Sequence, residues 1–186
     1  WRIGVLAVDG KENSQAAWKP LGAYLSAKVP GRRFEIKALE YLELDAAVKN
    51  GGVDFLVCNP ALFEMAAREH DFRELVSMKP SADQKGNFAD LGSVFICASR
   101  SVDLQAFQDL KGRRVAAVAP LSLGGCLAGR YELEVSGMPS ASVEWVYSGS
   151  SDKVFRAVLG GEVDAGVIPI GFLERMKQEQ RFRKDD

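Results

Sequence analysis

Histidine and cysteine are scarce in this sequence, and their scarcity argues against a metal centre. The 186 residues include one histidine and three cysteines, and the spacing of the cysteines fits no zinc-binding pattern. His70 follows a run of helix-forming residues, so we interpret it as a helix-end residue rather than a ligand. No motif gathers carboxylates that could replace histidine ligands. We therefore expect neither a metal nor another cofactor.

The sequence also lacks an excess of positive charge. Its 24 Lys and Arg residues are balanced by 25 Asp and Glu residues, which gives a formal net charge of -1. Nucleic-acid binding would need a concentrated basic patch. The basic residues near the end, Arg181, Arg183 and Lys184, are interpreted as a solvated end. We expect no nucleic-acid partner.

Long apolar runs and targeting signals are missing as well. No run approaches the roughly 20 residues that span a bilayer. The chain opens directly into Trp1–Leu6, which has the pattern of a strand, and it stops in charged residues. Both ends resemble cuts in a longer polypeptide, so we expect a domain excised from a larger protein.

The usual catalytic motifs are absent too. The sequence has no Gly-x-Ser-x-Gly elbow and no Walker loop ending in Gly-Lys-Ser/Thr. Its one histidine is poorly placed for a triad, and no carboxylate pair is marked out by spacing. These absences favour a binding function over an enzymatic one.

What the sequence does contain is a regular alternation of strand and helix patterns. The strand candidates are short and β-branched or continuously apolar, as in strands buried on both faces. The pattern predicts an α/β fold with a mainly parallel sheet. Pro20 falls within the first helical pattern, so that helix either kinks or starts late. The predicted strands are Arg2–Val8, Phe34–Leu39, Val53–Cys58, Leu91–Ser99, Arg113–Val118, Val143–Tyr147 and Ala165–Ile168.

One segment occurs twice, 110 residues apart. Residues 47–54, Ala-Val-Lys-Asn-Gly-Gly-Val-Asp, return at 157–164 as Ala-Val-Leu-Gly-Gly-Glu-Val-Asp. Each copy is typical of a helix, a glycine turn and a strand, with glycine at the left-handed helix C-cap. We infer two similar α/β lobes with a hinge and a central cleft. The predicted ranges are 1–92 for lobe 1, 93–170 for lobe 2, and 171–186 for a C-terminal helix that packs back on lobe 1.

Candidate ligand contacts follow the strands, because open α/β sheets bind ligands outside the carboxyl ends of their strands. In the second half, Ser122 is placed to cap a helix whose first turn holds Gly124 and Gly125. Two glycines there suggest close approach to the backbone, and a helix N-terminus readily binds oxyanions. The turn at Ser148 and Gly149 offers a second set of donors, although both segments are also explained as simple caps. The first-half candidates are Asp9, Lys11, Trp18, Tyr41 and Asn59; the two aromatic residues also suit a core.

The three cysteines receive different interpretations. A helix N-terminus lowers the pKa of a thiol, so we hypothesise that Cys126 is the most reactive thiol and contacts the ligand. The alternative is that Cys126 is simply a small buried apolar residue. Cys58, at the end of a strand, is more easily explained as buried. Cys97 lies in an apolar strand and is predicted to be a core residue.

Several segments resemble the phosphonate-type periplasmic solute-binding family, over nearly the whole chain. The similarity is strongest to the branch that serves as extracytoplasmic sensor domains of bacterial histidine kinases, including tetrathionate-type sensors. The matching segments are Gly4–Ala7, Trp18–Leu21, Val53–Leu56 with Asn59-Pro60, Asp109–Val118, Ser122 with Gly124-Gly125, and Gly161–Pro169.

The resemblance implies a type II periplasmic-binding-protein fold that closes on a small, anionic or sulfur-containing solute. It also implies a periplasmic or extracytoplasmic location, a membrane-anchored parent kinase and a dimer formed through that parent. Ligand contacts are implied at Asn59, Ser122, Gly124, Gly125 and the Ser148-Gly149 turn. Two alternatives stay open: a receptor of an ABC transporter for phosphonate-like oxyanions, and a small enzyme on a similar two-lobed fold.

Overall fold

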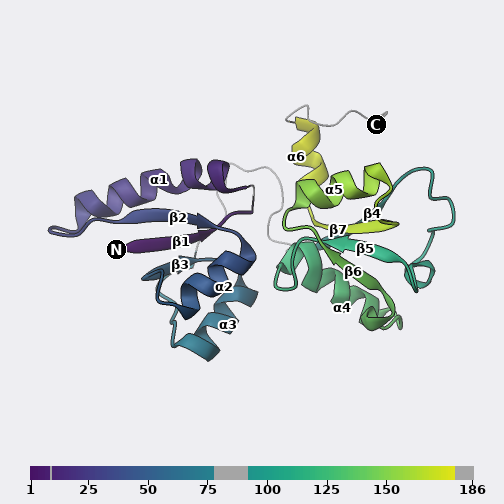
Figure 1. The fold of residues 1–186 in the computed structure, drawn as a ribbon, viewed down its shortest axis with the longest axis horizontal. Coiled ribbons are helices and arrows are strands. Elements are labelled where there is room, and N and C mark those ends of the chain that lie inside the picture. Colours follow the sequence, from purple (N-terminus) through teal and green to yellow (C-terminus); the bar gives the residue numbers. More distant parts are fainter. Residues whose placement is uncertain (9, 78–91, 179–186) are drawn as a thin grey trace. The chain divides into compact units, whose positions relative to one another are not determined.

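The computed structural model describes residues 1–8, 10–77 and 92–178. The chain divides into two compact units, Trp1–Glu74 and Leu75–Asp186, and each contains its own sheet flanked by helices (Figure 1). All of the predicted strands are present, each within two residues of its expected ends. The two-unit α/β organisation expected from the alternating pattern is therefore confirmed.

The first unit is a parallel three-stranded sheet in the order β2-β1-β3. Its core is built on Ile3, Val5 and Ile36, which are nearly inaccessible to solvent. Pro20 lies inside α1, which already begins at Lys11, so of the two expected alternatives, a kink or a late start, the late start is wrong. The elements are β1 (Arg2–Leu6), α1 (Lys11–Lys28), β2 (Glu35–Leu39), α2 (Tyr41–Lys49), β3 (Phe55–Val57) and α3 (Pro60–His70).

The second unit has a four-stranded sheet in the order β4-β7-β5-β6, in which only β4 runs antiparallel to its neighbour. Its apolar core includes Val115, Leu133 and Val167. The strands are β4 (Ser93–Cys97), β5 (Arg114–Ala117), β6 (Glu144–Tyr147) and β7 (Ala165–Pro169). The helices are η1 (Phe107–Leu110), η2 (Leu123–Leu127), α4 (Ala128–Val135), η3 (Ser140–Ser142), α5 (Ser151–Gly160) and α6 (Phe172–Gln178).

The repeated segment forms the same structure in both units. After α2, the Gly51 N–H donates to the Val48 carbonyl; after α5, the Gly161 N–H donates to the Val158 carbonyl. Both glycines are left-handed, with φ of 60° and 72°, as expected for this C-cap. The two copies of the repeated sequence therefore form equivalent hydrogen bonds.

A matching pair of clamps joins the strands that flank these helices. In the first unit, the Arg2 N–H donates to the Asp54 carboxylate at 2.7 Å, and the Asp54 N–H donates to the Arg2 carbonyl at 2.9 Å. In the second unit, the Arg114 N–H donates to the Asp164 carboxylate at 2.9 Å, and the Asp164 N–H returns to Arg114 at 2.9 Å. We call these the Arg2–Asp54 and Arg114–Asp164 clamps. Each fixes the amino end of one strand against the amino end of its neighbour.

The division of the chain differs in detail from the expected one. It falls after Glu74, whereas the predicted boundary was residue 92; β4, the first strand after that point, belongs to the second unit as expected. Helix α6 is grouped with the second unit, where the Phe172 ring lies 6.3 Å from the Phe155 ring. That the C-terminal segment also packs on the first lobe stays a prediction.

Candidate functional site

Three predicted residues of the first unit gather where its strands end. Asn59 caps α3 by accepting the Leu62 N–H at 3.0 Å, and its amide donates to the Tyr41 hydroxyl at 3.2 Å. The Lys11 ammonium, in the first residue of α1, forms an ion pair with Glu43 of α2. These contacts connect the first turns of α1, α2 and α3. Asp9, the fourth candidate in this region, lies outside the described residues.

Charge at this edge is internally compensated. The hydrogen bond to Glu43 raises the pKa of Lys11, and the same bond lowers the pKa of Glu43. The Glu43 carboxylate also accepts the N–H of Glu40 at 3.0 Å, at the start of α2. Lys11 is thus held by a carboxylate of the chain itself. A bound anion would have to share this ammonium group with Glu43.

Trp18, which we expected to be a possible ligand contact, packs against the core of the first unit instead. Its ring is half-buried and packs against the core cluster of Ile3, Val5 and Ile36. It lies in the middle of α1, away from the helix start that follows β1. Core packing explains this residue without a ligand.

In the second unit, the predicted cap is present, but the reason for the glycines differs from the expected one. The Ser122 hydroxyl accepts the Gly125 N–H at 3.2 Å, and the following turn, η2, is a π-helix. A Cβ on Gly125 would overlap the Val118 side chain and lie 2.7 Å from the Ser122 hydroxyl. A Cβ on Gly124 would lie 3.0 Å from the Gly92 carbonyl. Neighbouring parts of the chain itself require both glycines.

The Ser148-Gly149 turn is likewise committed to internal bonds. The Ser148 N–H donates to Ala117 at 2.9 Å, and the Gly149 N–H donates to Val118 at 2.8 Å. The expectation that these two N–H groups are free to bind a ligand is therefore wrong. Both N–H groups extend the pairing of β6 with β5. Gly149 is left-handed, with φ of 85°, which allows the chain to turn toward α5.

The cysteines overturn two expectations. Cys126 is fully buried, and burial raises its pKa, which opposes the expected activation by a helix N-terminus. Cys97 is exposed rather than a core residue, because β4 is an edge strand of its sheet. Cys58 is half-buried as the simpler interpretation had it, and burial raises its pKa to about 11. The hypothesis that Cys126 is the most reactive thiol is not supported.

Tyr147, an aromatic residue that could line a cleft or pack in a core, belongs to the candidate site because it is exposed at a strand end. It ends β6, is 45% exposed, and its hydroxyl is hydrogen-bonded to the Cys126 thiol. The Arg130 charge acts on both groups and lowers the pKa of each, against the larger effect of burial. In the sequence, the position of Tyr147 at the end of a predicted strand, just before Ser148, was the signal that could have identified it as a candidate ligand contact.

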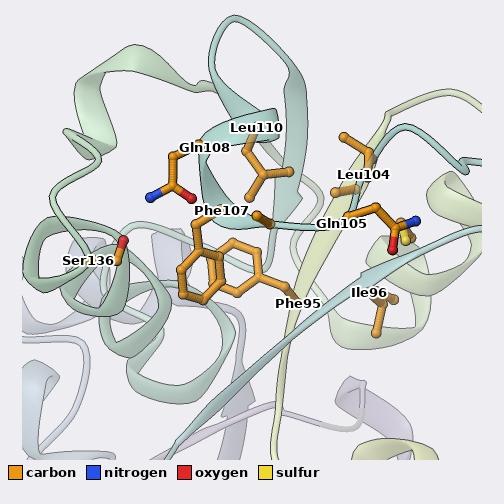
Figure 2. Close-up of a pocket in the computed structure, with 11 residues that line it drawn as sticks. Phe95, Ile96, Leu104, Gln105, Phe107, Gln108, Leu110 and Ser136 are labelled. Atoms are coloured by element: carbon orange, nitrogen blue, oxygen red, sulfur yellow. The ribbon is translucent and has the colours of Figure 1, made fainter.

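A separate pocket of about 480 Å³ lies within the second unit (Figure 2). Apolar side chains dominate it; the rings of Phe95 and Phe107 lie 5.1 Å apart, with Gln105, Gln108 and Ser136 around them. It includes Ala165, the first residue of β7, and so adjoins the amino end of that strand. No predicted ligand-binding residue lines it, and we do not assign the ligand to it.

Among residues 1–8, 10–77 and 92–178, no group of histidine, cysteine and carboxylate side chains could hold a metal ion. Within the same ranges, no helix combines the length and apolar character needed to cross a membrane.

Comparison with known proteins identifies relatives over the whole chain. The tetrathionate sensor histidine kinase TtrS of Salmonella typhimurium is 31% identical over 188 residues, which cover 100% of this chain but 32% of that protein. The chain thus spans about a third of that relative's length.

Solved structures show the same fold at low sequence identity. PhnD1 from Prochlorococcus marinus, in complex with methylphosphonate, matches 97% of this chain and 67% of its own, with a TM-score of 0.77 and 17% identity. A binding protein of an ABC phosphonate transporter from Pseudomonas aeruginosa matches 97% of this chain and 60% of its own, with a TM-score of 0.72 and 16% identity. The fold is therefore that of the type II periplasmic binding proteins.

The sequence model of one family, described as "ABC transporter, phosphonate, periplasmic substrate-binding protein", matches residues 3–186. The expected periplasmic or extracytoplasmic location agrees with this match and with the sensor-kinase relative. The chain belongs to the phosphonate-type family of periplasmic substrate-binding proteins.

Proposed function

We propose that this chain is the extracytoplasmic ligand-binding domain of a two-component sensor histidine kinase. The observation that carries the proposal is the similarity to a tetrathionate sensor histidine kinase along the entire chain, at 31% identity. In this proposal the domain binds a small solute, and the rest of a membrane-anchored, dimeric parent transmits the signal. The kinase chemistry belongs to the parent.

The carboxyl ends of the strands supply the proposed ligand contacts. Tyr41, Asn59 and Lys11 form one group in the first unit, and Tyr147 and the η2 turn form another in the second. A solute that contacts both groups would favour the closed form of a two-lobed protein, because a ligand shifts an equilibrium toward the state it binds better. Ligand binding would thereby cause the domain to close.

A transporter receptor for phosphonate-like oxyanions is the second candidate. The family description and the methylphosphonate-bound structural neighbour favour it. The relatives found are binding and sensor proteins, so we infer that this domain binds its solute without converting it. Mass spectrometry of a bound solute before and after incubation would contradict this if a new product accumulated.

A domain exchange tests sensor against receptor. The matching region of the tetrathionate sensor kinase would be replaced by this chain, and kinase-dependent reporter expression would be measured with a panel of small solutes. We expect a reporter response to the same solute that raises the melting temperature of the isolated domain. Binding by the domain without any response in the exchanged kinase would favour the receptor alternative.

A further inference from the structure

Basic and aromatic side chains form a patch on the first unit, at the amino ends of its strands. They come from the C-terminal half of α1, from the connection between α1 and β2, and from the residue before β1; these segments lie at one end of the first unit (Figure 1). Three members are apolar or aromatic and exposed: Trp1 by 48%, Tyr24 by 58% and Val29 by 38%. The amino-edge patch, as we call it, consists of Trp1, Tyr24, Lys28, Val29, Arg32 and Arg33.

The cations of the patch lie beside its aromatic rings. The Lys28 ammonium is 5.9 Å from the centre of the Tyr24 ring, one turn earlier on α1, and the Arg32 guanidinium is 5.0 Å from the centre of the Trp1 ring. The Trp1 ring stacks on the Phe55 ring, with centres 5.2 Å apart, and Phe55 packs against the core of the first unit. The core therefore holds the Trp1 ring in place beneath an exposed positive charge.

Charge on the patch is of one sign. From residue 19 to residue 34 the sequence has four Lys and Arg residues and no carboxylate. In the part of the chain that the structure describes, Lys28, Arg32 and Arg33 form no ion pair. All three side chains are exposed. They are available to an anion outside the protein.

The two carboxylates at the same strand ends have Arg2 beside them. Asp54 pairs with the Arg2 side chain, with Nε and Oδ2 3.4 Å apart. Glu35 is the register partner of Arg2 in the pairing of β1 with β2, and it precedes the buried Ile36. Because successive side chains of a strand point to opposite faces of the sheet, Glu35 lies on the face opposite the core cluster. The Trp1 ring, by contrast, packs on the side of that core.

Exposed cations alone are ordinary on a protein surface, but their combination with exposed aromatic rings fits one kind of partner. Tryptophan and tyrosine rings are enriched at the headgroup level of bilayers, and anionic lipids attract nearby Lys and Arg side chains. We propose that the amino-edge patch binds the surface of an anionic phospholipid bilayer. This inference goes beyond the proposed sensing function and uses only the extracytoplasmic location that belongs to it.

The position of the patch is compatible with solute binding by the same unit. The three strands of the first sheet are parallel, so their amino ends share one edge and their carboxyl ends share the opposite edge. The candidate ligand contacts Lys11, Tyr41 and Asn59 follow the carboxyl ends. A bilayer bound at the amino edge therefore leaves these three residues open to a solute.

Removal of the cations tests the electrostatic part of the proposal. Co-sedimentation would measure binding of this chain to vesicles of phosphatidylglycerol and phosphatidylethanolamine in equal parts, and to vesicles of phosphatidylcholine alone. We expect binding to the anionic vesicles only. Each cation near an anionic surface contributes about fivefold in affinity. The triple variant Lys28→Gln, Arg32→Gln, Arg33→Gln should therefore bind the anionic vesicles roughly 100-fold more weakly.

A matched variant controls for total charge. It removes three exposed cations of the second unit, Lys111→Gln, Lys153→Gln and Arg156→Gln. Its affinity for the anionic vesicles should fall by less than about fivefold, because charges beyond the screening length of about 10 Å contribute little. An equal loss in the two triple variants would overturn the proposal, as would equal binding of the parent chain to phosphatidylcholine or no binding to the anionic vesicles.

A tyrosine pair tests the aromatic part and does not depend on the triple variants. Tyr24→Ser should weaken binding to the anionic vesicles by about fourfold or more, the effect of keeping one methylene-sized apolar group in water. Tyr131→Ser, at a 65% exposed position on α4, should leave that affinity unchanged. Both sites are exposed, so the melting temperatures should match that of the parent. Equal affinities of the two tyrosine variants would contradict a contact through Tyr24.

The same preparation distinguishes a bilayer from another polyanion. Binding to a short double-stranded DNA at least as tight as to the anionic vesicles would overturn the assignment of a lipid partner. None of these measurements uses a solute or a kinase. A failure of vesicle binding therefore leaves the proposed sensing function standing, and a silent exchanged kinase leaves the vesicle result standing.

Discussion

Single residues in this protein show how one sequence signal can have two physical causes. A glycine in the first turn of a helix allows any group to approach the backbone, whether it belongs to a ligand or to the protein. At Gly125 the group is the Val118 side chain, and at Gly124 it is the Gly92 carbonyl together with Pro169. Only the three-dimensional neighbours distinguish these causes. The substitution Gly125→Val, attractive as a probe of ligand binding, is therefore a probe of folding.

Gly125→Val should lower the free energy of unfolding by about 1–3 kcal/mol, the usual cost of overpacking a core. Gly160→Ala is the matched control, since a Cβ there would lie 3.6 Å from its nearest neighbour, an ordinary contact. That control should leave stability unchanged or raise it by up to about 1 kcal/mol. Urea unfolding of both variants would decide. A Gly125→Val protein as stable as the parent would contradict the packing explanation.

The exposed and buried thiols should react in the order Cys97, Cys58, Cys126. The thiolate is the reactive form, and burial raises the pKa of Cys58 to about 11 and also raises that of Cys126. Because a raised pKa leaves less thiolate below it, labelling of Cys58 should increase about tenfold per pH unit between pH 8 and 10. Timed alkylation with mass-spectrometric mapping measures these rates. Fastest labelling at Cys126 would restore the hypothesis of an activated thiol.

At the scale of elements, the two clamps predict equivalent effects in the two units. Asp54→Ala and Asp164→Ala each remove a carboxylate that accepts a backbone N–H, and each should cost about 1 kcal/mol. Asp45→Ala is the control, because the Asp45 carboxylate forms an exposed ion pair with Lys49 one turn away on α2, and its loss should cost less than about 0.5 kcal/mol. Denaturant midpoints of the three variants would test this. A cost confined to one unit would contradict the equivalence of the clamps.

The first clamp also predicts a response to acid. The hydrogen bond from the Arg2 side chain lowers the pKa of Asp54 below its ordinary value. A lowered pKa in the folded state stabilises the fold above the unfolded pKa of about 3.9, and this contribution is lost as pH falls through the lower folded value. Unfolding midpoints measured from pH 6 down to pH 2 should therefore fall less steeply below pH 4 in Asp54→Ala than in the parent. Parallel curves would argue against the shift.

The elements themselves were largely predictable because their signals are local. Alternation of apolar runs fixed the seven strands, and the glycine turn of the repeat gave the C-caps of α2 and α5. The cap by Ser122 and the cap by Asn59 follow from residue type and position. The features that the sequence pattern did not predict depend on contacts between distant parts of the chain. They are the edge position that exposes Cys97, the packing of Trp18 and the π-helical form of η2. These depend on which strands become neighbours.

At the scale of the whole molecule, the proposed function predicts a change of shape on binding. A solute that contacts both units should stabilise a closed form. Small-angle scattering of the isolated domain, with and without a solute that raises its melting temperature, should show a smaller radius of gyration at saturation. The comparison needs a non-binding solute at the same concentration as its control. An unchanged radius with saturating ligand would show that binding does not close the domain.

The two clamps have a consequence for the order in which the protein is made. The clamps join residues 52 and 50 positions apart, and Asp164 follows Asp54 by 110 residues. Domains generally fold N-terminal first as they emerge, and here the chain would emerge on the far side of the membrane. Two similar halves could in principle exchange equivalent strands. Because Arg2 and Asp54 both precede Arg114 and Asp164 in the chain, we expect the first clamp to form before the second and so to limit such exchange.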